Sequence, residues 1–154
     1  MIIAARTRAI TYNWFGIPKS YMHWPIVRKN KEIPDDFVIT HGGGALFKKN
    51  FISEALLNDE SYLTICPKTD DLWFSMLAMK SSKHVYVCAD ALIDIFFISH
   101  EEGLANQNTL TQARGLLAKI YNKLVLNILG RLGVKICGND DAYKKIQAYS
   151  KSIN

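Results

Sequence analysis

Long apolar runs are missing from this sequence of 154 residues. No stretch reaches the roughly 18 consecutive apolar residues of a membrane-spanning helix, and the longest candidate, residues 91–98, contains Asp94. Residues 1–6 have neither the basic segment nor the apolar run of a secretory signal. These absences predict a cytoplasmic protein, with a place at the inner face of the membrane as the alternative.

Cysteine is scarce, and its pattern excludes a metal site of the zinc-finger kind. Cys66, Cys88 and Cys137 are an odd number of thiols at distant positions in apolar surroundings. None of them has metal-site spacing, and such a pattern is typical of a reduced, intracellular compartment.

Acidic residues are outnumbered by basic ones, 14 against 19, which gives a formal net charge of +5. The basic residues are scattered, with the densest group between residues 119 and 151. This distribution fits a solvated helix face, an anionic membrane surface or a phosphate-bearing partner. Nucleic acid is not expected as a partner, because the sequence has no nucleic-acid-binding motif and no continuous basic stripe.

Internal repeats and low-complexity segments are also absent. The composition, 49% hydrophobic and 21% charged, is that of a globular protein. The length allows one domain with its own hydrophobic core, but it is too short for two domains that each have such a core. We therefore expect a single α/β domain over residues 1–154.

Residues 67–79 are predicted to begin the helix around which the chain is organised. Pro67 ends the preceding segment, and Thr69 is expected to cap the first turn. Asp70 and Asp71 then lie in that turn, where the helix dipole favours negative charge. They either do chemistry there or only complement the dipole. The apolar faces of this helix comprise Leu72, Trp73, Met76, Leu77 and Met79.

Strand and helix signals recur along the rest of the chain. Residues 1–5 are apolar without alternation, as in a strand covered on both faces, and suggest a start partway through a domain. Further strands are predicted at residues 37–40, 45–47, 83–88 and 92–98. Helices are predicted at residues 51–58, 109–129 and 140–150.

Three consecutive glycines, Gly42, Gly43 and Gly44, follow the predicted strand 37–40 and His41. Glycines in this position allow positive φ angles and a close approach of the backbone to a ligand. They are not a phosphate-binding loop, because the required glycine spacing and the Lys-Ser/Thr pair behind it are missing.

Residues 6–36 are irregular and rich in aromatic side chains, and their prolines and Gly16 interrupt regular elements. The rings, among them Trp24, either fold over the domain or line a groove for a planar or sugar-like ligand.

A polar loop at residues 99–108 contains His100 beside two glutamates. This histidine either ligates a divalent metal or is simply solvated. No second ligand is spaced to help it.

Taken in order, these segments resemble the C-terminal, acceptor-side half of bacterial GT-A type glycosyltransferases of surface and capsular polysaccharide synthesis. The resemblance covers residues 1–110, and its most specific part is the Pro-x-x-Asp-Asp-Leu-Trp motif at residues 67–73. The other matching segments are residues 3–8, 18–24, 41–47 and the loop around Asn106 and Asn108.

The resemblance implies a partial GT-A fold, a mixed sheet with packed helices. Residues 1–108 would form its acceptor-side core and residues 109–154 its C-terminal helices. It implies transfer of a sugar from a nucleotide-sugar donor to a hydroxyl group of a glycan acceptor, with inversion. Asp71, or alternatively Asp70, would be the base that removes the hydroxyl proton. The acceptor side would comprise Gly42, Gly43, Gly44, Trp73 and Trp24.

In that family the nucleotide-binding half precedes this region, and its Asp-x-Asp segment holds a divalent metal, Mn²⁺ or Mg²⁺, on the diphosphate. No Asp-x-Asp occurs in this sequence. We therefore expect a truncated or split product whose missing half comes from another chain, and no activity without that half. The alternative is a non-catalytic carbohydrate- or partner-binding remnant of such an enzyme, and peripheral membrane contact through the C-terminal helices is a further expectation.

Overall fold

The computed structural model describes residues 1–48, 51–81, 83–96 and 116–153. The chain divides into two compact units built from interleaved segments. Unit 1 comprises Met1–Ala9, Pro25–Phe96 and Ala142–Asn154, and unit 2 comprises Ile10–Trp24 and Phe97–Asp141. The strands all belong to unit 1 in the part of the chain that the structure describes.

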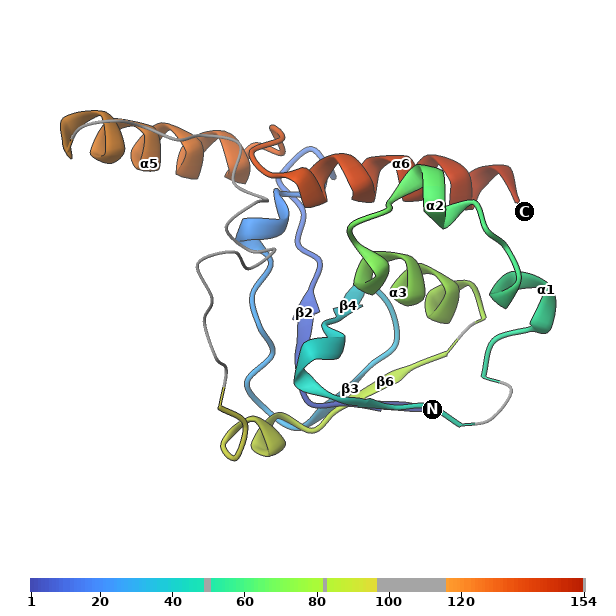
Figure 1. Cartoon of the computed structure of the whole chain (residues 1–154). Helices are drawn as coiled ribbons and strands as arrows, with labels where there is room; N and C mark the ends of the chain where they lie inside the picture. Colours follow the sequence, from blue (N-terminus) through green and yellow to red (C-terminus); the bar gives the residue numbers. More distant parts are fainter. Residues whose placement is uncertain (49–50, 82, 97–115, 154) are drawn as a thin grey trace. The chain divides into compact units, whose positions relative to one another are not determined.

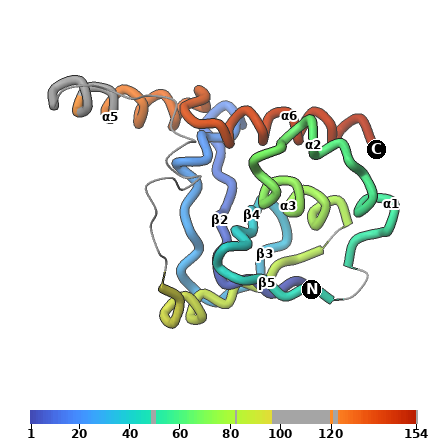
Figure 2. The backbone as a smooth tube through the Cα atoms, viewed as in Figure 1, coloured from blue at the N-terminus to red at the C-terminus, as the bar shows by residue number. Residues whose placement is uncertain are grey.

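The larger sheet of unit 1 has four strands in the order β3-β6-β1-β5, of which Figure 1 labels β3 and β6. β1 runs parallel to β6 and antiparallel to β5, and β3 runs antiparallel to β6, so the sheet is mixed. The predicted α/β class with a mixed sheet and packed helices is therefore confirmed. The strands are β1 (Ile2–Ala4), β3 (Lys31–Ile33), β5 (Ala45–Leu46), which is labelled in Figure 2, and β6 (Val85–Val87).

A second sheet pairs β2 (Thr7–Ala9) with β4 (Phe37–Ile39) in antiparallel register. The three residues of β4 are almost fully buried, which fits its unbroken apolar sequence. The strands predicted at residues 1–5, 37–40, 45–47 and 83–88 are all present, each slightly shorter than predicted.

Helix α3 (Asp70–Lys80) packs against β4 (Figure 1). Of the predicted apolar side chains, it buries Leu72, Trp73, Met76 and Leu77, and Met79 is partly buried. Thr69 is the N-cap residue, as predicted, but its hydroxyl makes no capping hydrogen bond. The backbone N–H of Asp71 is instead bound by the side chain of Asp70, at 3.0 Å. The carboxylate of Asp70, the first residue of the helix, thus caps one of the backbone N–H groups at the helix start.

Trp73 is the largest side chain on the other face of α3, and only 3% of it is exposed. Its ring lies between those of Tyr62 and Tyr149, with centroid separations of 6.1 and 5.5 Å. The Tyr149 hydroxyl donates a hydrogen bond to Asp59 at 2.5 Å. Aromatic packing therefore joins α2 (Tyr62–Ile65) and the end of α6 (Gly138–Ser152) to α3, and hydrogen bonds of Tyr149 with Asp59 and Ser61 join α6 to the segment before α2.

Two sequence predictions in unit 1 need correction. Only residues Glu54–Leu57 of the predicted helix 51–58 form a helix, α1, which Ser53 caps. The predicted strand 92–98 is wrong as far as the structure describes it: a short 3₁₀ helix, η3 (Ala89–Leu92), is followed by a turn without strand pairing up to Phe96. Residues 97 and 98 lie outside the described residues.

Unit 2 contains the 3₁₀ helix η1 (Tyr21–His23) and the helix α5 (Leu116–Arg131). The predicted helix 109–129 is confirmed from residue 116, and residues 109–115 lie outside the described residues. None of the helices in the described part of the chain has the length and apolar content to cross a membrane.

A buried carboxylate, that of Asp140, organises unit 2. It accepts hydrogen bonds from the Ser20 hydroxyl at 2.8 Å and from the backbone N–H of Tyr21 at 2.7 Å. It also accepts from the backbone N–H groups of Ile136 and Cys137, at 2.8 and 3.1 Å. One side chain therefore joins the aromatic segment to the turn before α6, because a buried carboxylate needs several donors.

We expect Trp73→Ala to lower the free energy of unfolding by roughly 3–5 kcal/mol, because a buried ring is removed and its partners are left around a cavity. Urea denaturation followed by circular dichroism measures this. Trp14→Ala is the matched control, since Trp14 is fully exposed, and should change stability by about 0.5 kcal/mol or less. Equal effects of the two variants would contradict the packing described for Trp73.

Cys137 should resist thiol reagents in the folded protein. Burial raises the pKa of its thiol to about 11, with the Asp140 carboxylate adding to the effect. Near pH 8 its thiolate fraction should be roughly a hundredfold lower than in the unfolded chain, because the folded pKa lies well above the ordinary value near 9. A disulfide reagent assay with and without denaturant measures this, and rapid labelling of Cys137 in the native protein would contradict it.

Candidate functional site

The best-organised polar pair in unit 1 consists of Asp71 and His41. One carboxylate oxygen of Asp71, Oδ1, accepts the backbone N–H of His41 at 2.9 Å and lies 2.6 Å from Nδ1 of the same residue's ring. The two side chains are 32% and 27% exposed. The pair is therefore held from inside the protein and open to solvent at one edge.

The chain positions this pair through its buried neighbours. β4 ends at Ile39, the 3₁₀ helix η2 (His41–Gly43) follows, and α3 begins at Asp70. Ser75, which is fully buried, donates to the backbone carbonyl of Asp71 at 2.6 Å and accepts the backbone N–H of Ile39 at 2.9 Å. The beginning of α3 is thereby attached to the end of β4, so the carboxylate meets the imidazole.

Aromatic rings enclose the imidazole of His41 on two sides. Phe47 stacks on it with a centroid separation of 5.7 Å, and Phe74 meets it edge-on at 5.5 Å. Apolar neighbours restrict how the ring can turn and limit the access of water. Nε2 is the ring nitrogen that does not contact Asp71.

The hydrogen bond to Asp71 has a chemical consequence for His41. A neutral imidazole carries one proton, and a carboxylate beside Nδ1 favours placing that proton on Nδ1. Nε2 then carries a lone pair and can accept a proton from a hydroxyl group. A carboxylate that orients an imidazole in this way is an arrangement suited to general-base chemistry.

The three glycines beside this pair have different roles. Gly43 lies against β2's preceding residue Arg6, because a Cβ built on Gly43 would be 2.4 Å from the Cβ of Arg6. Gly44 has φ +87°, a conformation that favours glycine. Gly42 has open space around it. The predicted positive φ therefore occurs at Gly44, and the close backbone approach is between Gly43 and the chain itself.

The other predicted site residues lie in different settings. Asp70 is exposed and is bound to the N–H of Asp71 instead of to His41. Trp73 is enclosed in unit 1, as described above. Trp24, in unit 2, is 1% exposed and donates its indole N–H to the carbonyl of Lys19 at 2.9 Å, so it folds inward. His100 lies outside the described residues.

No group of three His, Cys, Asp or Glu side chains that could hold a metal ion occurs among the described residues. The Asp71–His41 pair supplies two such groups and no third. The described part of the chain therefore does not fit a divalent metal, and no step through a metal is derived for it.

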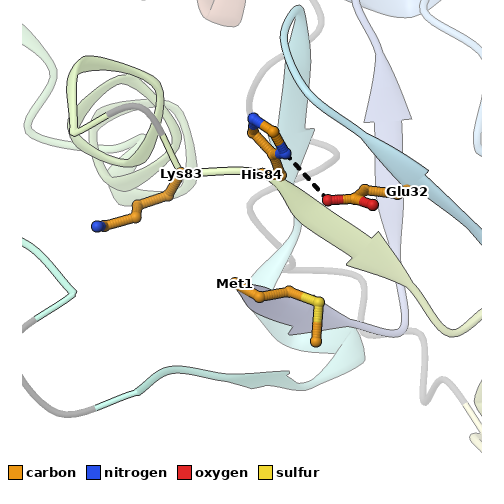
Figure 3. Close-up of a pocket in the computed structure, with 4 residues that line it drawn as sticks. All are labelled: Met1, Glu32, Lys83 and His84. Carbon is orange, nitrogen blue, oxygen red and sulfur yellow. Dashed lines mark hydrogen bonds and ion pairs between the residues drawn. The ribbon is translucent and has the colours of Figure 1, made fainter.

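A hollow of about 230 Å³ is lined by Met1, Glu32, Lys83 and His84. Figure 3 shows these four side chains. The His84 ring and the Glu32 carboxylate are 3.0 Å apart, but both side chains are more than half exposed. Exposed pairs of this kind are screened by water and contribute little. The hollow lacks the enclosed, preorganised polar groups of a binding site.

Comparison of the chain with known protein families, with curated proteins and with solved structures found no match. The site is therefore assessed on its geometry. His41 is the residue that sequence reasoning missed, since it was noted only as the neighbour of the glycines. A polar residue just beyond the end of a buried strand, as His41 lies two residues after the end of β4, is the signal that could have identified it.

The glycine geometry predicts opposite outcomes for two adjacent substitutions. Gly43→Ala should lower the free energy of unfolding by about 1–3 kcal/mol, because its new methyl group would overlap Arg6 and the backbone must move. Gly42→Ala is the matched control and should be neutral or stabilising by about 0.4–1 kcal/mol, because open space surrounds it. Thermal and urea unfolding measure both, and a tolerated Gly43→Ala would contradict the described approach.

Proposed function

We propose that this chain is the acceptor-side part of a GT-A type glycosyltransferase, which transfers a sugar from a nucleotide-sugar donor to a hydroxyl group of a glycan acceptor. The observation that carries the proposal is the Asp71–His41 pair, in which the carboxylate expected from the Pro-x-x-Asp-Asp-Leu-Trp motif contacts an imidazole. The mixed α/β architecture is compatible with such a fold.

In the proposed reaction, Nε2 of His41 accepts the proton of the acceptor hydroxyl as its oxygen attacks the anomeric carbon of the donor sugar. A new carbon–oxygen bond forms there, the bond from that carbon to the diphosphate breaks, and the nucleoside diphosphate leaves. Asp71 orients the ring through Nδ1 and stabilises the imidazolium that forms. His41 is thus the base, and Asp71 acts through it.

The donor side of the reaction is proposed to come from another polypeptide segment. The sequence contains no Asp-x-Asp, and the described residues hold no metal-binding group. The Mn²⁺ or Mg²⁺ expected for the complete enzyme would therefore belong to that nucleotide-binding segment. The role of this chain is to bind the glycan and to remove its proton.

In an enzyme reconstituted with its nucleotide-binding half, Asp71→Asn and His41→Gln should each lower turnover by about 10²–10⁴-fold, the usual contribution of a general base. Acceptor binding should change little, because each substitution keeps a polar side chain of similar size. Release of nucleoside diphosphate and formation of the extended glycan measure turnover. Asp70→Asn is the matched control and should retain turnover within about twofold, since Asp70 does not contact His41.

Full turnover by Asp71→Asn would overturn the assigned pair. Loss of activity in Asp71→Asn with full activity in His41→Gln would instead make Asp71 the direct base. If the chain binds glycans on an array but no nucleotide-sugar and no complementing half yields transfer, the non-catalytic glycan-binding remnant is the better description.

A further inference from the structure

One face of α5 in unit 2 is apolar and exposed. Ile120, Leu124 and Ile128 follow one another at intervals of four residues, so they form a single stripe along the helix. Each of these side chains is more than half exposed, and so is Leu132 just beyond the end of the helix. Apolar stripes of a soluble helix are normally turned toward a core, so an uncovered stripe indicates a binding surface.

The turn at residues 13–17 presents two more large apolar side chains to solvent. Trp14 is fully exposed and Phe15 is 83% exposed. Both belong to unit 2, like α5. Two adjacent aromatic rings are seldom fully exposed at the tip of a turn, because burial of such large apolar side chains would stabilise the fold.

The turn is held rigidly, so the exposure of its rings is built into the fold. The side-chain oxygen of Asn13 accepts the backbone N–H groups of Phe15 and Ile17, at 2.9 and 3.0 Å. The backbone N–H of Asn13 donates to the carbonyl of Ile17 at 2.8 Å, and Gly16 has φ +71°. These contacts close the turn and leave Trp14 and Phe15 outside it.

The turn is also attached to the end of α5. The Asn13 side-chain amide donates to the carbonyl of Leu132 at 2.8 Å. Gly133, with φ +88°, lies so close to the turn that an added Cβ would be 2.8 Å from Ile17. The turn and the end of α5 are therefore neighbours in unit 2, and we refer to their exposed apolar side chains together as the apolar face: Trp14, Phe15, Ile120, Leu124, Ile128 and Leu132.

The described segments of unit 2 carry a net positive charge. Residues 10–24 and 116–141 contain five lysines and arginines against two aspartates. The aspartates are occupied: Asp140 is buried and accepts the hydrogen bonds described above, and Asp141 is paired with Lys135. Lys123 and Arg131 are exposed on α5 itself. An apolar stripe with aromatic rings and basic flanks is complementary to an anionic lipid surface.

We propose that the apolar face of unit 2 docks on the surface of an anionic lipid bilayer. Trp14 and Phe15 enter the headgroup region, α5 lies in the plane of the interface, and Lys123 and Arg131 contact lipid phosphates. This is attachment to one leaflet, as expected of an amphipathic helix of this size. The inference is independent of the glycosyltransferase proposal, and its test requires no turnover.

The chain carries its own reporter for this docking. Of its three tryptophans, Trp24 and Trp73 are buried and Trp14 is fully exposed. Vesicles containing phosphatidylglycerol should therefore shift the emission of Trp14 to shorter wavelength and protect it from aqueous iodide, while brominated lipids should quench it. Vesicles of phosphatidylcholine alone should bind far more weakly, and high salt should reduce binding to the anionic vesicles.

Variants of the apolar face should weaken co-sedimentation with the anionic vesicles without unfolding the chain. Phe15→Ala and Trp14→Ala should each lower the partition coefficient about tenfold. Lys123→Gln and Arg131→Gln should each lower it about fivefold. Phe96→Ala is the matched control, because Phe96 is an equally exposed aromatic residue of unit 1, and it should bind like the parent chain.

Three results would overturn the proposal. The first is absence of binding to anionic vesicles at low salt. The second is binding that leaves Trp14 accessible to iodide or that Phe96→Ala weakens as much as Phe15→Ala does. The third is self-association, measured by analytical ultracentrifugation, that Phe15→Ala abolishes, because the face would then be covered by a second copy of the chain.

Discussion

Unit 1 depends on the buried hydroxyl of Ser75. Without it, the N–H of Ile39 at the end of β4 would lose its partner inside the protein, where an unsatisfied polar group costs about 1–3 kcal/mol. The same hydroxyl binds the carbonyl of Asp71, so one side chain sets the distance between the end of β4 and the start of α3. The Asp71–His41 contact follows from that distance. The hydroxyl of Ser75 thus holds both the packing of α3 on β4 and the pair proposed to do the chemistry.

Local patterns were enough to predict the elements whose sequence is strongly apolar or periodic. The strand at residues 37–40, the helix from Asp70 and the final helix were all predicted because hydrophobic periodicity is a property of neighbours. The apolar segment 92–98 was predicted to be a strand for the same reason, yet residues 89–92 form η3 and no partner strand pairs with residues 93–96. An apolar run alone fixes neither pairing nor burial, since both need a partner from elsewhere in the chain, and Ile93 and Phe96 of this run are exposed.

The candidate site shows the same division between local and distant information. Asp71 could be singled out because it stands in the first turn of a predicted helix, whereas its partner His41 comes thirty residues earlier and meets it only in the folded chain. Trp24 and Trp73 could be named as aromatic candidates, but their enclosure depends on contacts with Lys19 and Tyr149 that no local pattern contains. The prediction that His100 ligates a metal concerns a residue outside the described part of the chain.

The position of β1 between β5 and β6 has a consequence for how the chain folds. Ile2 is in register with Val85, so the parallel pairing at the centre of the sheet joins segments that are synthesised far apart in time. During translation β1 leaves the ribosome as an apolar strand whose β6 partner does not yet exist. Pairing over such a sequence separation is slow, because a large loop must close first. The apolar β1 segment therefore lacks its β6 partner until residues 85–87 have been synthesised, and unpaired apolar strands are prone to aggregate.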